Sequence, residues 1–119
     1  MTAVARQRLP DRRITITERV TWQGRSWHVS IGFDAAGRAR EIFLAGAKAG
    51  SEMDAIANDA AVLASMMLQA GGDPAAIARS MGRIGPAPAS IVGLALDCAA
   101  AVEASEGAAI RSAHGEGRP

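Results

Sequence analysis

The sequence predicts an α+β fold, in which a three-stranded antiparallel meander is followed by two or three helices packed on one face of the sheet. Three observations predict this class. Apolar and polar residues alternate over three successive stretches, short turn sequences separate these stretches, and from residue 51 onward the apolar spacing becomes helical. With 119 residues the chain has the length of one domain around one core.

Three strands are expected, over residues 13–22, 26–33 and 38–44. Gln23-Gly24 supplies a tight turn after the first strand, because glycine reaches the positive φ that hairpins require. Asp34 to Gly37 has the residues of a type I turn after the second strand. The alternation places the following residues on the apolar face: Ile14, Ile16, Val20, Trp22, Trp27, Val29, Ile31, Phe33, Ile42 and Leu44.

Three helices are expected after the strands, because Ser51, Asp73 and Ser90 each have the character of an N-cap and Asp73 precedes a proline. The first helix runs to about residue 70, the second is short and ends near residue 82, and the third ends near residue 104. Two prolines and a glycine exclude regular structure over 83–89. The residues expected to cover the sheet from the first helix are Ile56, Ala60, Leu63 and Met67, with Ala64 and Leu68 beside them.

Charge and composition divide the chain into a flexible basic arm (1–11), one domain (12–104) and a disordered tail (105–119). The formal net charge is only +1 and the clustered arginines lie in the arm, so binding to a nucleic-acid polymer is not expected. No run of about 20 apolar residues predicts a membrane span. The single cysteine fits a reducing cytoplasm. Because aromatic residues make up only 3% of the chain, the core is thin and a homo-oligomer is expected.

The residue pattern favours a binding protein over an enzyme, with no catalytic residues, no metal and no cofactor. His28 has no neighbouring acid, and His114 lies in the expected tail. Cys98 lies on an apolar helix face, where a cysteine is more often a small core residue than a nucleophile. No set of His, Cys, Asp and Glu has a recognised metal-ligand spacing.

Two loops that lead into helices are candidates for binding an anion. In the first, Lys48 precedes Gly50 and Ser51, so a phosphate could meet a cation and free backbone N–H groups; simple capping of a helix would give the same residues. In the second, a proline-stiffened loop lies between Arg83 and Ser90.

Two side-chain assignments stay open. Arg83 could pair with a ligand or with an internal acid such as Asp97. Trp22 and Trp27 could stack on a base or pack in the core.

The expected second and third strands and the turn between them contain Gly32-Phe33-Asp34, Gly37-Arg38 and Glu41-Ile42-Phe43, and Lys48-Ala49-Gly50-Ser51 follows as a helix start. With these segments as its most specific part, the sequence resembles the TSCPD domain over about residues 12–99. The family occurs as the C-terminal module of adenosylcobalamin-dependent ribonucleotide reductases and as short free-standing proteins of bacteria and phages. Pro88-Ala89-Ser90 stands where a Cys-Pro-Asp tripeptide names the domain, so zinc and cobalamin binding are not expected.

Together with the two candidate loops, the resemblance predicts a non-catalytic module that binds a nucleotide-like ligand. The residues expected to bind it are Lys48, Gly50, Ser51, Arg83 and Ser90. The expected role of the module is that of an accessory or regulator of ribonucleotide reduction, with a reductase subunit as a possible partner. The alternative is a phage-type anti-defence protein that sequesters cyclic nucleotide or cyclic ADP-ribose signals.

Overall fold

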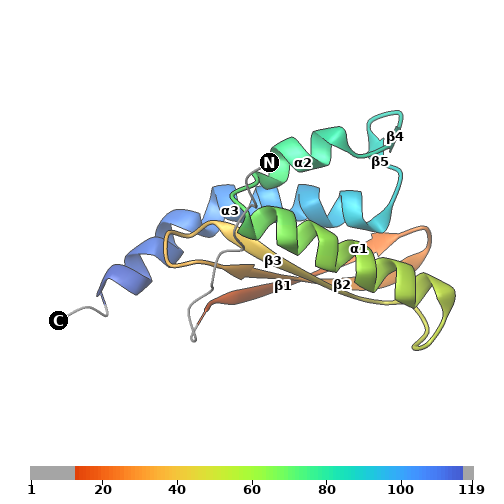
Figure 1. Ribbon diagram of the computed structural model, residues 1–119, viewed down its shortest axis with the longest axis horizontal. Coiled ribbons are helices and arrows are strands. Elements are labelled where there is room, and N and C mark those ends of the chain that lie inside the picture. Colours follow the sequence, from red (N-terminus) through yellow and green to blue (C-terminus); the bar gives the residue numbers. More distant parts are fainter. Residues whose placement is uncertain (1–12, 117–119) are drawn as a thin grey trace, which may run out of the picture.

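The computed structural model describes residues 13–116, which form a three-stranded antiparallel sheet with three helices on one face (Figure 1). The strands β1 (Thr15–Trp22), β2 (Arg25–Phe33) and β3 (Ala39–Ala45) lie in the order β1-β2-β3. Ile31 at the centre of β2 pairs with Ile16 on one side and Ile42 on the other, which puts apolar side chains on the face below the helices. The predicted α+β meander is confirmed.

The helices are α1 (Glu52–Gln69), α2 (Pro74–Ser80) and α3 (Ile91–Glu116). The three predicted N-caps are confirmed: Ser51 Oγ accepts from Asp54 N at 3.2 Å, Asp73 Oδ2 from Ala76 N at 3.2 Å, and Ser90 Oγ from Gly93 N at 3.1 Å. Each cap satisfies a backbone N–H that the first turn of a helix leaves without a partner. In Figure 1, α1 and α3 start at the same end of the molecule and run in the same direction.

The face of α1 that covers the sheet differs in part from the prediction: Ala64 and Leu68 are buried as expected, but most of the other predicted residues are not. Its core-facing residues are a row that we call the inner seam: Ala57, Ala61, Ala64 and Leu68. The large residues expected to cover the sheet are exposed instead, Ile56 by 56%, Leu63 by 64% and Met67 by 53%. Small side chains let the helix axis approach the strands closely, and this is why alanines take the inner positions.

We call a second row the outer seam. It consists of the exposed Met53, Ile56, Leu63 and Met67, with the half-buried Ala60 at its centre.

Two polar side chains of α1 cover the outer edge of β3. Ser65 Oγ accepts from Ile42 N at 2.9 Å and donates to Ile42 O at 3.2 Å, and Gln69 Nε2 donates to Arg40 O at 3.1 Å. An edge strand otherwise presents unpaired backbone groups to other chains. The helix therefore closes this edge as well as one face of the sheet.

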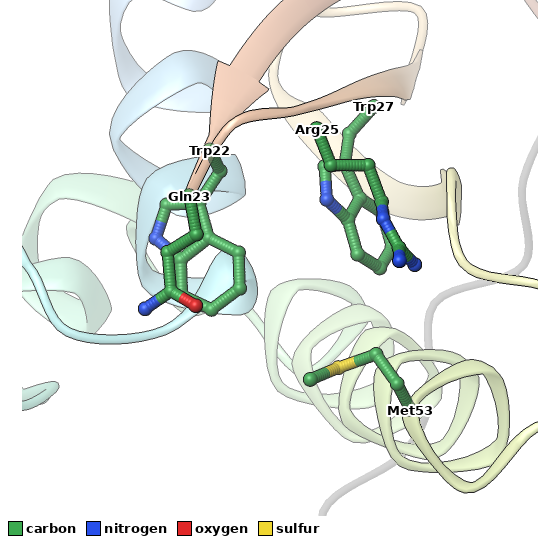
Figure 2. Close-up of a pocket in the computed structure, with 5 residues that line it drawn as sticks. All are labelled: Trp22, Gln23, Arg25, Trp27 and Met53. Carbon is green, nitrogen blue, oxygen red and sulfur yellow. The ribbon is translucent and has the colours of Figure 1, made fainter.

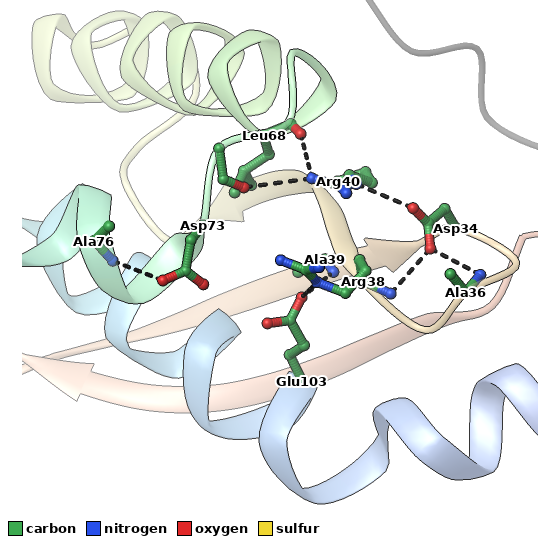
Figure 3. A network of polar contacts seen from close by, with 10 residues as sticks. Asp34, Ala36, Arg38, Ala39, Arg40, Leu68, Asp73, Ala76 and Glu103 are labelled. Carbon is green, nitrogen blue, oxygen red and sulfur yellow. Dashed lines mark hydrogen bonds and ion pairs between the residues drawn. The ribbon is translucent and has the colours of Figure 1, made fainter.

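A polar network ties β3 to α1 and α3 (Figure 3). Asp34 Oδ2 pairs with Arg40 Nε at 3.0 Å, and Arg40 Nη1 donates to Leu68 O at 2.6 Å near the end of α1. Farther along the turn, Glu103 Oε1 of α3 accepts from Arg38 Nε at 3.1 Å and from Ala39 N at 2.8 Å. The turn between β2 and β3 is thus held by both long helices.

The expected disordered tail from residue 105 is wrong for the part that the structure describes, because α3 continues to Glu116. Gly107 and Ile110 are buried, and Gly107 lies against Gly37 so closely that a Cβ on Gly37 would collide with the Gly107 carbonyl oxygen. Glycine at both positions permits this contact. The polar composition of the segment suggested disorder, but its few apolar and small residues are spaced to meet the β2–β3 turn.

Residues 83–89 also differ from the prediction, because they contain a short hairpin of β4 (Arg83–Ile84) and β5 (Ala87–Pro88). Gly85, with φ of 61°, makes its turn. The predicted arm, residues 1–11, lies outside the described residues, as do residues 117–119. Within residues 13–116, no helix has the length and apolar character needed to cross a membrane.

Candidate functional site

A pocket lies at the end of the molecule where the β1–β2 hairpin turns. Gln23 and Gly24 have φ of 50° and 73°, the backbone form of a two-residue type I′ turn. This turn makes Trp22 and Arg25 direct cross-strand neighbours. The backbone therefore brings a tryptophan and an arginine to the same end of the hairpin.

We call this hollow the hairpin pocket, and it has a volume of about 190 Å³ (Figure 2). Its lining residues are Trp22, Gln23, Arg25, Trp27 and Met53. Trp27 is only 2% exposed and makes the buried wall, whereas Trp22 is half-buried. Met53, from the first turn of α1, lies below the two indoles in the view of Figure 2.

Two features of the Trp27 wall stand out. The Trp27 Nε1 atom is buried without a hydrogen-bond partner among the described residues. A Cβ on Gly46 would lie 2.5 Å from Trp27 Cδ2, so the chain after β3 passes directly against the indole. Trp27 is therefore fixed by packing and has a donor that no described side chain or backbone group uses.

The charge of the pocket comes from Arg25. Its side chain extends beside the Trp27 ring in Figure 2, and the described residues offer it no ion pair. Arginine next to tryptophan is a favourable combination, because the guanidinium is attracted to the indole face. The guanidinium keeps N–H donors for an anion.

The predicted Lys48–Ser51 turn ends two residues before Met53, but none of its residues lines the hairpin pocket. Ser51 N and Ser51 Oγ both donate to Lys48 O, at 3.0 and 2.6 Å. Gly50 N donates to Asp54 Oδ2 at 3.1 Å, so a carboxylate of the helix already occupies the place of a bound anion. The contacts of Gly50 and Ser51 are therefore those of a helix cap. The exposed Lys48 side chain forms no ion pair with any of residues 13–116.

The second predicted loop is only partly connected to the pocket. Arg83 Nη2 pairs with Asp97 Oδ1 at 2.9 Å, which is the internal pairing that the sequence left open, and Arg83 Nη1 donates to Pro86 O at 3.2 Å. Ser90 lines an adjoining hollow of about 140 Å³ that Trp22 and Met53 also line. The structure thus brings Ser90 to Trp22 and Met53. The other predicted site residues, Lys48, Gly50, Ser51 and Arg83, line neither hollow.

Gln23, Arg25 and Met53 were not expected in the site. The signal for Arg25 was present, because a two-residue turn makes the residues on either side of it neighbours. No feature of the sequence indicated that Met53 belongs to the site, since its position depends on how α1 packs on the sheet.

The described residues offer no reactive constellation beside this pocket. Burial raises the pKa of the Cys98 thiol, and the nearby charge of Glu18 raises it further, so the thiolate is disfavoured. Residues 13–116 contain no group of three or more His, Cys, Asp and Glu side chains that could hold a metal ion.

The geometry defines a small α+β domain with an aromatic and cationic pocket at one end. The family model of the TSCPD domain matches residues 3–103, and the chain belongs to this family. No curated protein and no solved structure matches the chain.

The most recognisable family residues have structural roles here. Phe33 and Ile42 are core residues, and Asp34 and Arg38 belong to the polar network of the β2–β3 turn. They build the framework that carries the hairpin pocket.

Proposed function

We propose that this protein is a cytoplasmic, non-catalytic module that binds a nucleotide-like anion in the hairpin pocket. The observation that supports this most is that Arg25, whose guanidinium has no ion pair among residues 13–116, lines the same pocket as Trp22. A base offers a flat ring to the indole and a phosphate offers oxygens to the guanidinium.

The size of the pocket limits what it encloses. A volume of about 190 Å³ is below the roughly 300–1,000 Å³ typical of sites that bury a whole ligand. We therefore expect one base to enter beside Trp22, with the phosphate at the rim beside Arg25. Stacking of a base contributes about 1–3 kcal/mol, and a hydrogen bond to a charged group about 1.5–3 kcal/mol.

The family resemblance supports a role as accessory or regulator of ribonucleotide reduction, with a reductase subunit as partner. Sequestration of a cyclic nucleotide or cyclic ADP-ribose is the second candidate, because such a ligand also offers a base and phosphate oxygens to Trp22 and Arg25. In either role the ligand is bound and released unchanged.

Tryptophan fluorescence tests the proposal directly, because both tryptophans of the chain line the pocket. Nucleoside triphosphates, cyclic dinucleotides and cyclic ADP-ribose are titrated in turn into the full-length protein. A ligand that stacks on Trp22 should quench the emission, and Trp22→Phe should remove most of that quench. The same ligand at 100 times its dissociation constant should stabilise the fold by about 2.7 kcal/mol.

Arg25→Ala should weaken binding about 10- to 100-fold, since one charge-assisted hydrogen bond is lost. Arg19→Ala is the matched control, because Arg19 lies in the same hairpin, is exposed, and contacts only Ser26 among the described residues. If none of these ligands changes fluorescence or melting temperature, or if both arginine variants weaken binding equally, the proposed site is wrong.

A further inference from the structure

α1 carries two apolar seams, and only one of them covers the sheet. The inner seam alternates steps of four and three residues (57, 61, 64, 68), and the outer seam does the same (53, 56, 60, 63, 67). This spacing is that of residues that meet a neighbouring helix. The outer seam has the larger side chains of the two, and they are the exposed ones.

A groove runs along the outer seam. One hollow of about 280 Å³ lies between Leu63 and Met67 on one side and Met81 and Leu96 on the other. The 140 Å³ hollow described above continues it toward Met53, and the two share Ala60 and Val92. No charged side chain lines either hollow, which excludes an occupant held by charge.

The dimensions of the groove suit a protein partner of modest affinity. From residue 53 to residue 67 the helix rises about 21 Å, and two neighbouring helices give a width of about 20 Å. The face therefore covers roughly 400 Å², which matches the larger apolar patches on monomers, many of them functional. It is about half of the 800 Å² per partner in a standard interface.

We propose that the groove is occupied by a second copy of this chain, with the two α1 helices antiparallel about a two-fold axis near Ala60. The seam is nearly symmetric about that residue, with Met53 and Met67 seven positions away on either side. An isologous interface needs this property, because each residue meets its counterpart from the opposite half of the partner.

The side chains of the seam fit such a pairing. Ala60, the smallest residue of the seam, lies at the centre, where the two helices come closest. Ile56 and Leu63 flank it at four and three positions and face the hollows of the partner. The antiparallel arrangement also places opposite ends of the helix dipoles together.

The groove shares Trp22 and Met53 with the hairpin pocket, but the test of the dimer needs no nucleotide. Sedimentation of the full-length protein from about 1 to 200 µM should show a reversible monomer–dimer equilibrium. Leu63→Asp should raise the dissociation constant by more than about tenfold, because the carboxylate must enter an apolar groove in both copies.

Val62→Asp is the matched control. Val62 is the adjacent residue and is 52% exposed, but it lines a different hollow, beside β3. This variant should dimerise like the wild type. A protein that stays monomeric over the whole range, or a dimer that both variants disrupt equally, would overturn the proposal.

Cross-linking tests the position of the axis. In a Cys98→Ala background, Ala60→Cys should give a covalent dimer with a short bis-maleimide, whereas Asn58→Cys, on the β3 side of α1, should not. Equal cross-linking at both positions would show that α1 does not pair in this way. Circular dichroism of each variant identifies any that has lost its fold.

Discussion

Asp34 shows how a single family residue organises its surroundings. Its Oδ1 accepts from Ala36 N at 2.9 Å and from Arg38 N at 3.0 Å, which shapes the turn. Its Oδ2 neutralises Arg40, and Arg40 in turn holds the end of α1 through Leu68 O. The sequence predicted the turn, because Asp and Gly at its ends are a local signal. The link from Arg40 to α1 was not predictable, because it joins residues 28 positions apart.

Replacing Asp34 with alanine should destabilise the protein by about 3–5 kcal/mol, since it leaves the buried guanidinium of Arg40 without its counter-charge. Urea unfolding followed by circular dichroism measures the change. Asp97→Ala serves as control, because its ion pair with Arg83 is exposed and should contribute less than about 1 kcal/mol. Equal effects of the two substitutions would show that burial of the Asp34–Arg40 pair does not matter.

At the scale of elements, local sequence determines where α1 begins, whereas packing determines which of its faces covers the sheet. Its start at Ser51 was predicted, because a cap and the helix it begins lie within four residues. Its orientation was predicted wrongly, because the inner and outer seams have the same spacing and periodicity alone cannot choose between them. Which row faces the sheet depends on how closely the helix packs against the strands. With Ile56 and Leu63 on the inner side, their large side chains would keep the helix farther from the sheet.

Ser65 gives a test of how α1 closes the edge of β3. Ser65→Ala leaves both the N–H and the C=O of Ile42 without their side-chain partner, and the expected cost is about 1–3 kcal/mol. Hydrogen exchange at the Ile42 amide should accelerate. In the control Ser80→Ala, only an exposed hydroxyl bond to Ala76 O is lost, and the exchange of Ile42 should not change. Unchanged exchange in Ser65→Ala would mean that the edge is protected in another way.

For the whole molecule, the fold class and the order of the elements were predictable from periodicity and turns, but the extent of α3 was not. From the sequence alone, Gly107 predicts the end of a helix. In the fold it permits the close contact with Gly37, which joins residues far apart in the sequence. The hairpin pocket was missed for a similar reason, because Met53 reaches Trp22 only through the packing of α1.

A chain ending at Ala104 tests the contribution of the last part of α3. The truncation removes Ile110 from the core and Gly107 from the β2–β3 turn, so we expect a loss of about 2 kcal/mol or more. The melting temperature, from calorimetry, should fall by about 5 °C or more. Removal of 117–119 alone is the control and should have little effect. A truncated protein with an unchanged melting temperature would contradict the folded role of this segment.

The contacts of Glu103 also have a consequence for synthesis. Its partners, Arg38 and Ala39, precede it by 65 and 64 positions. At roughly 5–20 residues per second, a ribosome needs about 3–13 s to make the intervening chain. During those seconds the nascent β2–β3 hairpin keeps these donors bonded to water, and only the arrival of α3 completes the turn.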